Sequence, residues 1–191
     1  MPFRWITQRR ALVSGKSRSC SHASTMAYMP EQSAWRVDNR KWTKRSFNGI
    51  GAALEGGRWN SAGIPAVYAS EHLAMAAQEK FVHLPRPLPR GSRYVRFEIR
   101  FRGLPVTRLR SADLPPDWRA EPVPVSTQRI GDAWISTART AILSVPSVLY
   151  PEETNYVLNT AHPDFPRIEV SPGEPFAFDP RMAWLIEPAD A

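Results

Sequence analysis

The chain has 191 residues, enough to enclose one sizeable core, and its length calls for no second domain. Its hydrophobic fraction is 42%, with seven Trp and eight Phe. This excludes a disordered protein, because disordered chains lack the aromatic side chains that offset chain entropy. The net charge of +7 would suggest a nucleic-acid partner if it were spread over the folded part of the chain.

The positive charge is concentrated in residues 1–25. This Ser- and Arg-rich leader has five basic residues and no acidic one, so the rest of the chain has 20 basic and 18 acidic residues, a net charge of +2. We therefore predict no direct binding of nucleic acid by the folded part. The leader lacks the apolar run of a secretion signal, although its composition superficially resembles a transit peptide. An equally simple interpretation, which we favour, is that translation begins at Met26 or Met29. The expected division is a disordered or untranslated leader over 1–25 and one domain over 26–191.

The positions of the cysteine and histidine residues and the lengths of the apolar runs argue against several kinds of site. Cys20 is the only cysteine and lies in the leader, so the body has no disulfide, thiolate zinc site or cysteine nucleophile. The cytoplasm is the expected compartment. No apolar run approaches the roughly 20 residues that span a bilayer, so we predict no membrane insertion. The four histidines form no metal-ligand pattern, and we predict no bound metal.

The first half of the body contains a strand and a helix joined closely. Four glycines predict a loop that ends at Arg58-Trp59-Asn60, and the apolar run 66–69 predicts a buried strand. Ser70 is placed to cap a helix from Glu71 to about Leu84, which Pro85 ends. One face of this helix has the three-and-four spacing of a core stripe, formed by Leu73, Ala77, Phe81 and Leu84.

Short strands dominate the second half. Polar and apolar residues alternate over 94–101, which predicts a half-buried strand. Eight of the 19 prolines fall between Pro85 and Pro124, which favours a loop over 111–125. Further expected elements are a short helix over 126–136 and strands over 141–150, 155–158 and 167–170. Strands gather after the main helix and do not alternate regularly with helices, so the expected fold class is α+β.

Common nucleotide and hydrolase motifs are absent. The segment 49–54 reads Gly-Ile-Gly-Ala-Ala-Leu and lacks the third glycine of a dinucleotide fingerprint. No Walker A loop, HExxH helix or GxSxG elbow is present, which excludes the usual NTPase, metalloprotease and serine-hydrolase sites.

A series of short motifs remains, in a fixed order between about residues 35 and 182. They are Trp35-Arg36, Gly51-Ala52, Gly56-Gly57-Arg58-Trp59-Asn60, Val67-Tyr68-Ala69-Ser70, the helix bearing Glu79, Ile130-Gly131-Asp132-Ala133-Trp134, Val145-Pro146-Ser147, Asn155-Tyr156-Val157-Leu158-Asn159, His162-Pro163 and Phe178-Asp179-Pro180-Arg181. In order and rough spacing these motifs resemble the RES-domain family of bacterial toxins. By position, the Arg, Glu and Ser that name the family are Arg58, Glu79 and Ser147.

The resemblance implies a fold, a substrate and a partner. The expected fold is similar to that of ADP-ribosyltransferases, a split β-sheet with flanking helices that holds NAD in its cleft. Family members consume NAD as glycohydrolases or phosphorylases, or ADP-ribosylate a protein. Each is silenced by a cognate Xre-type antitoxin, a helix-turn-helix protein that blocks the cleft.

The chemistry suits the carboxylate and arginines that the resemblance selects. Cleaving the nicotinamide–ribose bond leaves an oxocarbenium-like ribose, much as in glycoside hydrolysis. Glu79 is expected to bind a ribose hydroxyl and stabilise that cation, while Arg36 and Arg58 fork onto the diphosphate.

Three further residues complete the expected NAD site. Tyr68 is expected to stack on nicotinamide, Ser147 to donate a hydrogen bond to ribose or phosphate, and Asn159 to line the same cleft.

Each of these residues also has an ordinary structural interpretation. Glu79 lies about 200° around the helix from its core stripe, where a solvated glutamate is common. Arg58 could be a surface cation, Tyr68 a core aromatic and Ser147 a turn hydroxyl. On the pattern alone these alternatives remain open, and the family resemblance favours the functional roles.

Two other functions are alternatives to an NAD-consuming toxin. A noncatalytic binding module would not need the acid, the arginines and the tyrosine together. A ribonuclease or RNA binder is suggested only by the sequence pI of about 10.1, and it predicts that removing residues 1–25 abolishes function.

Overall fold

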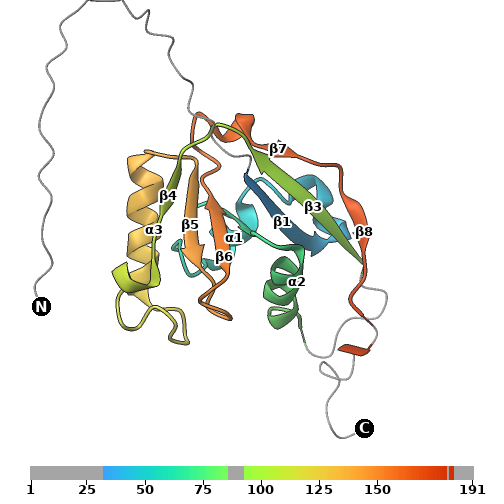
Figure 1. Cartoon of the computed structure of the whole chain (residues 1–191), viewed down its shortest axis with the longest axis horizontal. Coiled ribbons are helices and arrows are strands. Elements are labelled where there is room, and N and C mark those ends of the chain that lie inside the picture. Colours follow the sequence, from blue (N-terminus) through green and yellow to red (C-terminus); the bar gives the residue numbers. More distant parts are fainter. Residues whose placement is uncertain (1–31, 86–92, 180, 183–191) are drawn as a thin grey trace, which may run out of the picture.

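The computed structural model describes residues 32–85, 93–179 and 181–182, and the leader lies outside this range. In the described part, one mixed sheet carries eight strands, with three α-helices around it (Figure 1). The α+β class predicted from the sequence is confirmed. The strands are β1 (Gln32–Asn39), β2 (Val67–Ser70), β3 (Tyr94–Phe101), β4 (Val106–Arg108), β5 (Ile142–Pro146), β6 (Thr154–Leu158), β7 (Glu169–Val170) and β8 (Glu174–Phe176).

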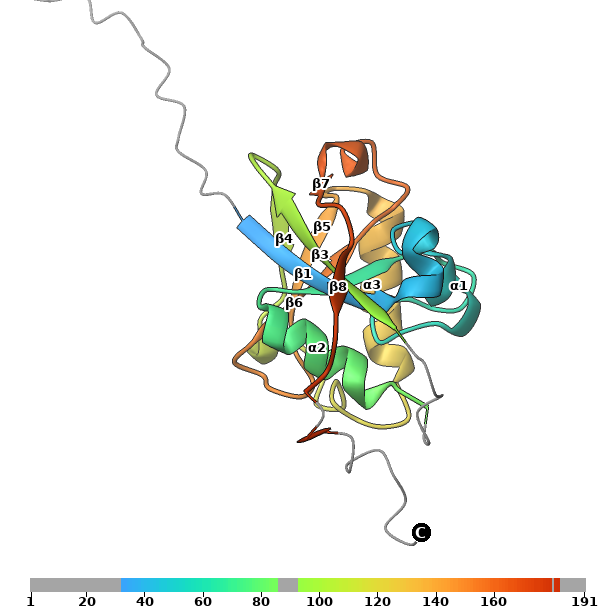
Figure 2. The same cartoon turned by 90° about the vertical axis from the view of Figure 1, so that its right-hand side faces the viewer.

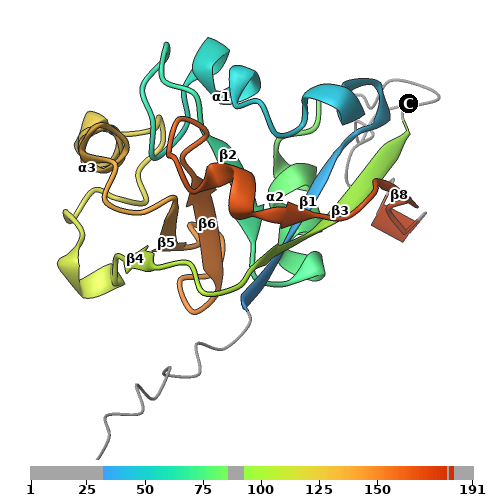
Figure 3. The ribbon, with the colours of Figure 1, turned by 90° about the horizontal axis from the view of Figure 1, so that it is seen from above.

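The sheet is split near its middle. Its strand order is β4-β5-β6-β2-β1-β3-β7, and β8 pairs with β3 beside β7. Strand β1 pairs with β3 along its whole length, and β2 pairs with β6 along its whole length. In contrast, β1 and β2 meet at one residue pair only, Trp35 opposite Ser70. Seen from above, the β4-β5-β6 half and the β1-β3 half turn away from each other (Figure 3). This is the split sheet expected from the family resemblance.

Each half of the sheet has its own helix. Helix α2 (Leu73–Val82) packs on β1 and β3 through a cluster around Val37, Phe81 and Tyr94. Helix α3 (Val125–Thr137) packs on β5 and β6 through Trp134 and its neighbours. Figure 2 shows α2 beneath β1, with α3 behind on the other half of the sheet. A third cluster, which contains Ile99 and Phe101, lies under the middle of the sheet.

Two predicted elements match the structure closely. The strand predicted over 94–101 is β3, with Val95, Phe97, Ile99 and Phe101 buried as the alternation required. The helix predicted over 126–136 is α3, which is one residue longer at each end.

The prediction of the main helix is correct for its buried face and wrong for its first residue. All four stripe residues contribute to the same apolar cluster, as predicted. The helix begins at Leu73, however, and Ser70 does not cap it. Ser70 is the last residue of β2 and donates to Asn155 Oδ1 at 2.6 Å, while Glu71 N bonds Thr154 O. Pairing with β6 therefore continues through the residues that the capping pattern assigned to the helix.

Several elements were missed or misplaced. The glycine-rich segment contains a short helix, α1 (Ile50–Glu55), where a loop was predicted. Gly49 and Gly56 flank this helix with φ of 73° and 75°, a region that favours glycine, so the glycines mark its two ends. The sequence did not predict β1, β4 or β8. The strand predicted over 141–150 ends at Pro146, because the chain then turns back into β6.

Candidate functional site

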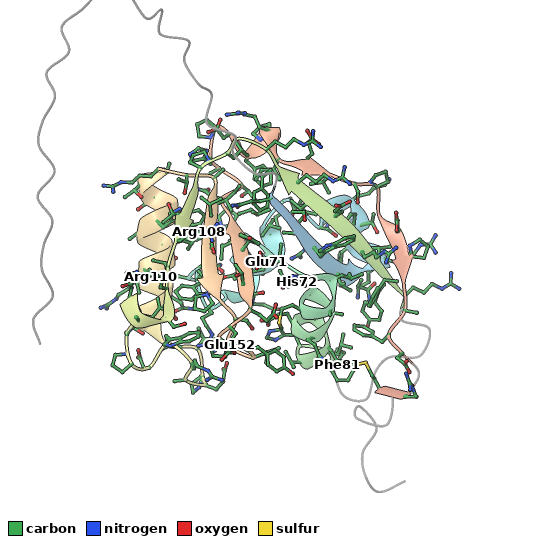
Figure 4. The ribbon with its side chains drawn as sticks, in the orientation of Figure 1. Glu71, His72, Phe81, Arg108, Arg110 and Glu152 are labelled. Carbon is green, nitrogen blue, oxygen red and sulfur yellow. The ribbon has the colours of Figure 1, made fainter. Side chains whose placement is uncertain are left out.

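A cleft of about 650 Å³ lies where the sheet splits. Its lining comes from both halves of the molecule: β1, α1 and the loop after it, β2, α2, and short stretches around residues 121–123 and 146–149. The volume is in the range of small-molecule sites. Figure 4 labels Glu71 and His72 where the chain enters α2, and Phe81 near the other end of this helix. Glu79 lies one turn before that end.

Glu79 is held from the opposite half of the sheet. It is half-buried in the cleft lining, and its Oε1 accepts hydrogen bonds from Ser147 Oγ at 2.9 Å and Asn155 Nδ2 at 2.6 Å. Both bonds end on Oε1 and neither uses Oε2. The interpretation of Glu79 as a solvated surface glutamate therefore does not describe its surroundings.

Ser147 supports the carboxylate from within the fold. It is fully buried, and its Oγ accepts from the backbone of Leu149 at 3.1 Å and Tyr150 at 3.3 Å. The residue is thus a turn hydroxyl, as the structural interpretation held, and also a donor to Glu79. It is not among the residues that line the cleft.

Tyr68 presents its ring to the cleft while its hydroxyl is occupied. The Oη donates to Asn60 Oδ1 at 2.6 Å and accepts from Trp59 N at 3.0 Å. Burial raises the pKa of Tyr68 well above its usual value of 10, so the phenol stays neutral. A Cβ at Gly57 would lie 2.6 Å from this Oη, so the loop can approach Tyr68 only with glycine there.

Arg36 belongs to a cluster of charges at the split, in which Asp38 is buried and the two cations are half-buried. Its Nη1 donates to Tyr68 O at 2.7 Å, which joins β1 to β2 beyond their single ladder pair. Its Nη2 donates to Asp38 at 3.1 Å, and Lys80 Nζ donates to the other Asp38 oxygen at 3.4 Å. Burial alone would raise the pKa of Asp38, but the charges of Arg36 and Lys80, together with hydrogen bonds, lower it below its usual value.

Arg58 ties the glycine-rich loop to the segment before α3. Its Nη1 donates to the carbonyls of Trp118 at 2.7 Å and Ala120 at 3.1 Å, and its Nη2 pairs with Glu121. The Arg58 side chain is 10% exposed and that of Glu121 is 70% exposed. Both residues line the cleft, so an anion there could take the place of the Glu121 carboxylate.

Comparison with known families decides what kind of protein carries this cleft. The RES domain matches residues 33–179, which include every cleft residue described above. The chain belongs to the RES-domain family.

Related RES proteins match over most of the chain. A protein of Sphingobium sp. named Prs ADP-ribosylating toxin is 38% identical over 154 residues, 78% of this chain and 96% of that protein. A protein of Yersinia enterocolitica named Toxin Res is 34% identical over 150 residues, 78% of this chain and 97% of that protein. A chain of the M. tuberculosis MbcT-MbcA toxin–antitoxin complex has a similar fold, with a TM-score of 0.56 and 19% identity over 82% of this chain and 88% of that chain.

The RES fold brings together most of the residues that the sequence assigned to the site. Arg36, Arg58, Tyr68 and Glu79 line one cleft, and Ser147 touches Glu79 from behind. Asn159 lies elsewhere. It is 1% exposed, its Nδ2 donates to Ile135 O and its Oδ1 accepts from Ala161 N, so its amide fastens the end of β6 to α3. We leave Asn159 out of the proposed site.

Three residues of the RES cleft were not assigned from the sequence. Asn155 was only part of a matching motif, yet it makes the shorter bond to Glu79. A polar amide at the start of a buried apolar strand could have signalled it, because buried amides need partners. Asp38 and Lys80 gave no such signal, since their contact depends on how α2 lies on β1.

The remaining observations concern metals and membranes. Among the described residues, no group of three or more His, Cys, Asp or Glu side chains is placed to hold a metal ion. Within the same part of the chain, no helix has both the length and the apolar character needed to cross a membrane.

Proposed function

We propose that this RES domain is the NAD-consuming toxin of a toxin–antitoxin pair and cleaves the bond between nicotinamide and ribose. The observation that carries the proposal is the Glu79 carboxylate, anchored through one oxygen in a cleft that Arg36, Arg58 and Tyr68 also line. An acid, two guanidinium groups and an aromatic ring match the three parts of NAD that must be held for this reaction.

Glu79 would act on the ribose. Departure of neutral nicotinamide leaves positive charge on the anomeric carbon, and a carboxylate already fixed nearby stabilises that charge most in the transition state. Because both protein donors bind Oε1, Oε2 is the oxygen we assign to a ribose hydroxyl.

Arg36 and Arg58 would hold the diphosphate. Guanidinium groups bind phosphate through paired N–H donors, and both side chains line the cleft. At Arg58, a phosphate would replace the exposed Glu121 carboxylate while the bonds to Trp118 and Ala120 keep the guanidinium in place. The Tyr68 ring would stack on nicotinamide, since its hydroxyl is already paired.

The acceptor of ADP-ribose defines two candidate activities at this one site. Water or phosphate would make the toxin an NAD glycohydrolase or phosphorylase. A protein acceptor would make it an ADP-ribosyltransferase, and the relative named Prs ADP-ribosylating toxin, 38% identical, favours this second candidate.

The proposed partner is a cognate antitoxin of the Xre type, and the cytoplasm is where we expect the pair to act. Support comes from the fold shared with a chain of a toxin–antitoxin complex. It also comes from large apolar side chains exposed at the cleft, namely Trp42 at 46%, Ile50 at 50%, Leu54 at 75% and Val82 at 43%. Apolar residues around a cleft are suited to a protein that covers it.

The test is product analysis of NAD incubated with the purified protein, with and without phosphate and with cell extract. Nicotinamide should be released in each case. The second product should be ADP-ribose when water is the acceptor, ADP-ribose 1-phosphate when phosphate is the acceptor, and ADP-ribosylated protein when a protein of the cell extract is the acceptor. Glu79→Gln should lower the rate by about 100-fold or more, the scale of losing one group that stabilises transition-state charge. Glu71→Gln is the matched control, because Glu71 is exposed and lies outside the cleft lining.

Two results would contradict parts of this proposal. Equal nicotinamide release by Glu79→Gln and the parent would remove the role of the carboxylate. No consumption of NAD by the folded parent under any of the three conditions would remove the proposed function itself.

A further inference from the structure

We infer that Asn155 is a positioning residue for Glu79: together with Ser147 it holds one carboxylate oxygen and so turns the other toward the cleft, through hydrogen bonds whose direction is fixed by the surrounding fold. The inference rests on the proposed function, because it concerns how the same carboxylate is prepared for its task. Asn155 lies on β6 and Glu79 on α2, which belong to different halves of the split sheet.

The direction of the bond from Ser147 is fixed by its backbone neighbours. A serine hydroxyl has one hydrogen to donate and two lone pairs to accept with. The amides of Leu149 and Tyr150 both donate to Ser147 Oγ, so its lone pairs are used. Its only hydrogen therefore points to Glu79 Oε1, 2.9 Å away.

The direction of the bond from Asn155 is fixed in a similar way. Ser70 Oγ donates to Asn155 Oδ1 at 2.6 Å, which leaves the amide nitrogen facing Glu79. If the amide were reversed, its oxygen would lie 2.6 Å from a carboxylate oxygen with no hydrogen between them. Ser70 is 2% exposed and ends β2, so this donor is part of the sheet.

Two donors of fixed direction converge on one oxygen of Glu79. Together they fix the rotation of the carboxylate, because both bonds end on Oε1. Oε2, which neither donor uses, is presented to the cleft. Helix α2 is packed on β1, so the bonds from Ser147 and Asn155 also link the two halves of the sheet beside their single ladder pair.

Several other charged side chains near the cleft form ion pairs that do not involve Glu79, Ser147 or Asn155. Asp38 pairs with Arg36 and Lys80, Arg58 pairs with Glu121, and Glu153 pairs with His72 outside the cleft lining. The remaining titratable or charged side chains of the lining are Arg45, Glu55, Tyr68 and His83.

The experiment is the steady-state kinetics of NAD cleavage at neutral pH by the full chain and its Asn155→Ala variant. The kcat should fall about 10- to 100-fold while KM changes little, the scale of losing a hydrogen bond to a charged group. A general loss of structure would change both constants, so the split between kcat and KM separates positioning from folding.

Two further variants test the direction of the bonds. Asn155→Asp keeps the shape but replaces the amide donor with an acceptor that faces Glu79 Oε1, so it should lower kcat further than Asn155→Ala. Ser70→Ala frees the amide to reverse and should lower kcat less. Thr140→Val is the control, since it removes a buried hydroxyl outside the cleft lining, which bonds Trp134 of α3 and Ile142 of β5. It should lower the melting temperature and leave kcat unchanged.

A kcat that is equal in the parent and Asn155→Ala would overturn the inference, and so would a KM that rises as far as kcat falls, because a merely structural role predicts that both constants change. A crystal structure of Asn155→Ala, in which the Glu79 carboxylate should turn from its place in the parent, provides a readout that needs no NAD turnover. An inactive parent whose Glu79 carboxylate turns in Asn155→Ala would support the positioning role and remove the proposed function.

Discussion

Single side chains of the cleft have structural contacts and are also proposed to bind a ligand. Tyr68 is a core aromatic with a satisfied hydroxyl, as its structural interpretation held, and it still lines the cleft. Arg36 joins β1 to β2 and remains part of the lining, with its buried Nε left without a partner among the described residues. Structural contacts therefore do not exclude the proposed functional roles.

The ion pairs of Asp38 should make the stability of the folded protein depend on pH. Its folded pKa is lowered: burial opposes ionisation, but Arg36 and Lys80 outweigh it. The ionised carboxylate therefore stabilises the fold above the unfolded pKa near 3.8, and this contribution is lost as pH falls below that value. Asp38→Asn should lower the free energy of unfolding by about 2 kcal/mol at neutral pH, the scale of hydrogen bonds to a charged group.

Urea unfolding of the parent and Asp38→Asn at a series of pH values measures this effect. The difference in the free energy of unfolding should shrink as pH falls below about 4. A difference that stays constant from neutral to acidic pH would show that the charge of Asp38 is not what stabilises the cluster.

At the scale of elements, α3 approaches the glycine-rich loop so closely that one position tolerates no side chain. A Cβ at Gly131 in α3 would lie 1.8 Å from Trp59 O, a backbone atom that cannot move away cheaply. The contact seats the loop that carries Arg58 against the helix, and Asp132 reinforces it with two bonds to Ser61. The sequence shows only a glycine in the middle of a helix, which propensity alone would count as unfavourable.

Gly131→Ala should therefore destabilise the protein by about 1–3 kcal/mol through overpacking, although alanine is the better helix former by about 1 kcal/mol. The matched control is Gly51→Ala in α1, where an added Cβ meets nothing within 4 Å, and it should be neutral or slightly stabilising. Thermal and urea unfolding of the two variants would decide. Equal stability of both would contradict the close contact between α3 and the loop.

At the scale of the whole molecule, the cleft and its supports begin well inside the chain. The RES match starts at residue 33, and among the described residues the first that lines the cleft is Trp35. Removing residues 1–25 should therefore leave NAD consumption and toxicity unchanged, even though it lowers the net charge by five. The RNA-binding alternative, which depends on that charge, predicts that the same truncation abolishes function, so growth assays and NAD assays on one truncated protein separate the two.

Local patterns predicted the elements in which buried side chains recur at a regular period. Alternation placed β3 residue for residue, and helical spacing identified the buried stripe of α2. Strand β1 escaped prediction because it is paired on both sides and carries polar side chains. Besides pairing with each other, Arg36 and Asp38 bond Tyr68 and Lys80, which are distant in sequence. The start of α2 was misplaced because pairing with β6 overrode a local capping signal at Ser70.

The sequence by itself determined the fold class, the family and the side chains with the chemistry for the proposed reaction, because composition, periodicity and ordered motifs are properties of the chain alone. The tertiary structure decided how these side chains are used. It placed Asn155 and Ser147 on Glu79, joined Arg36 to Tyr68 and Asp38 to Lys80, and placed Asn159 outside the cleft lining. Hydrogen bonds and ion pairs between residues tens of positions apart depend on which strands are neighbours, and no local pattern records that arrangement.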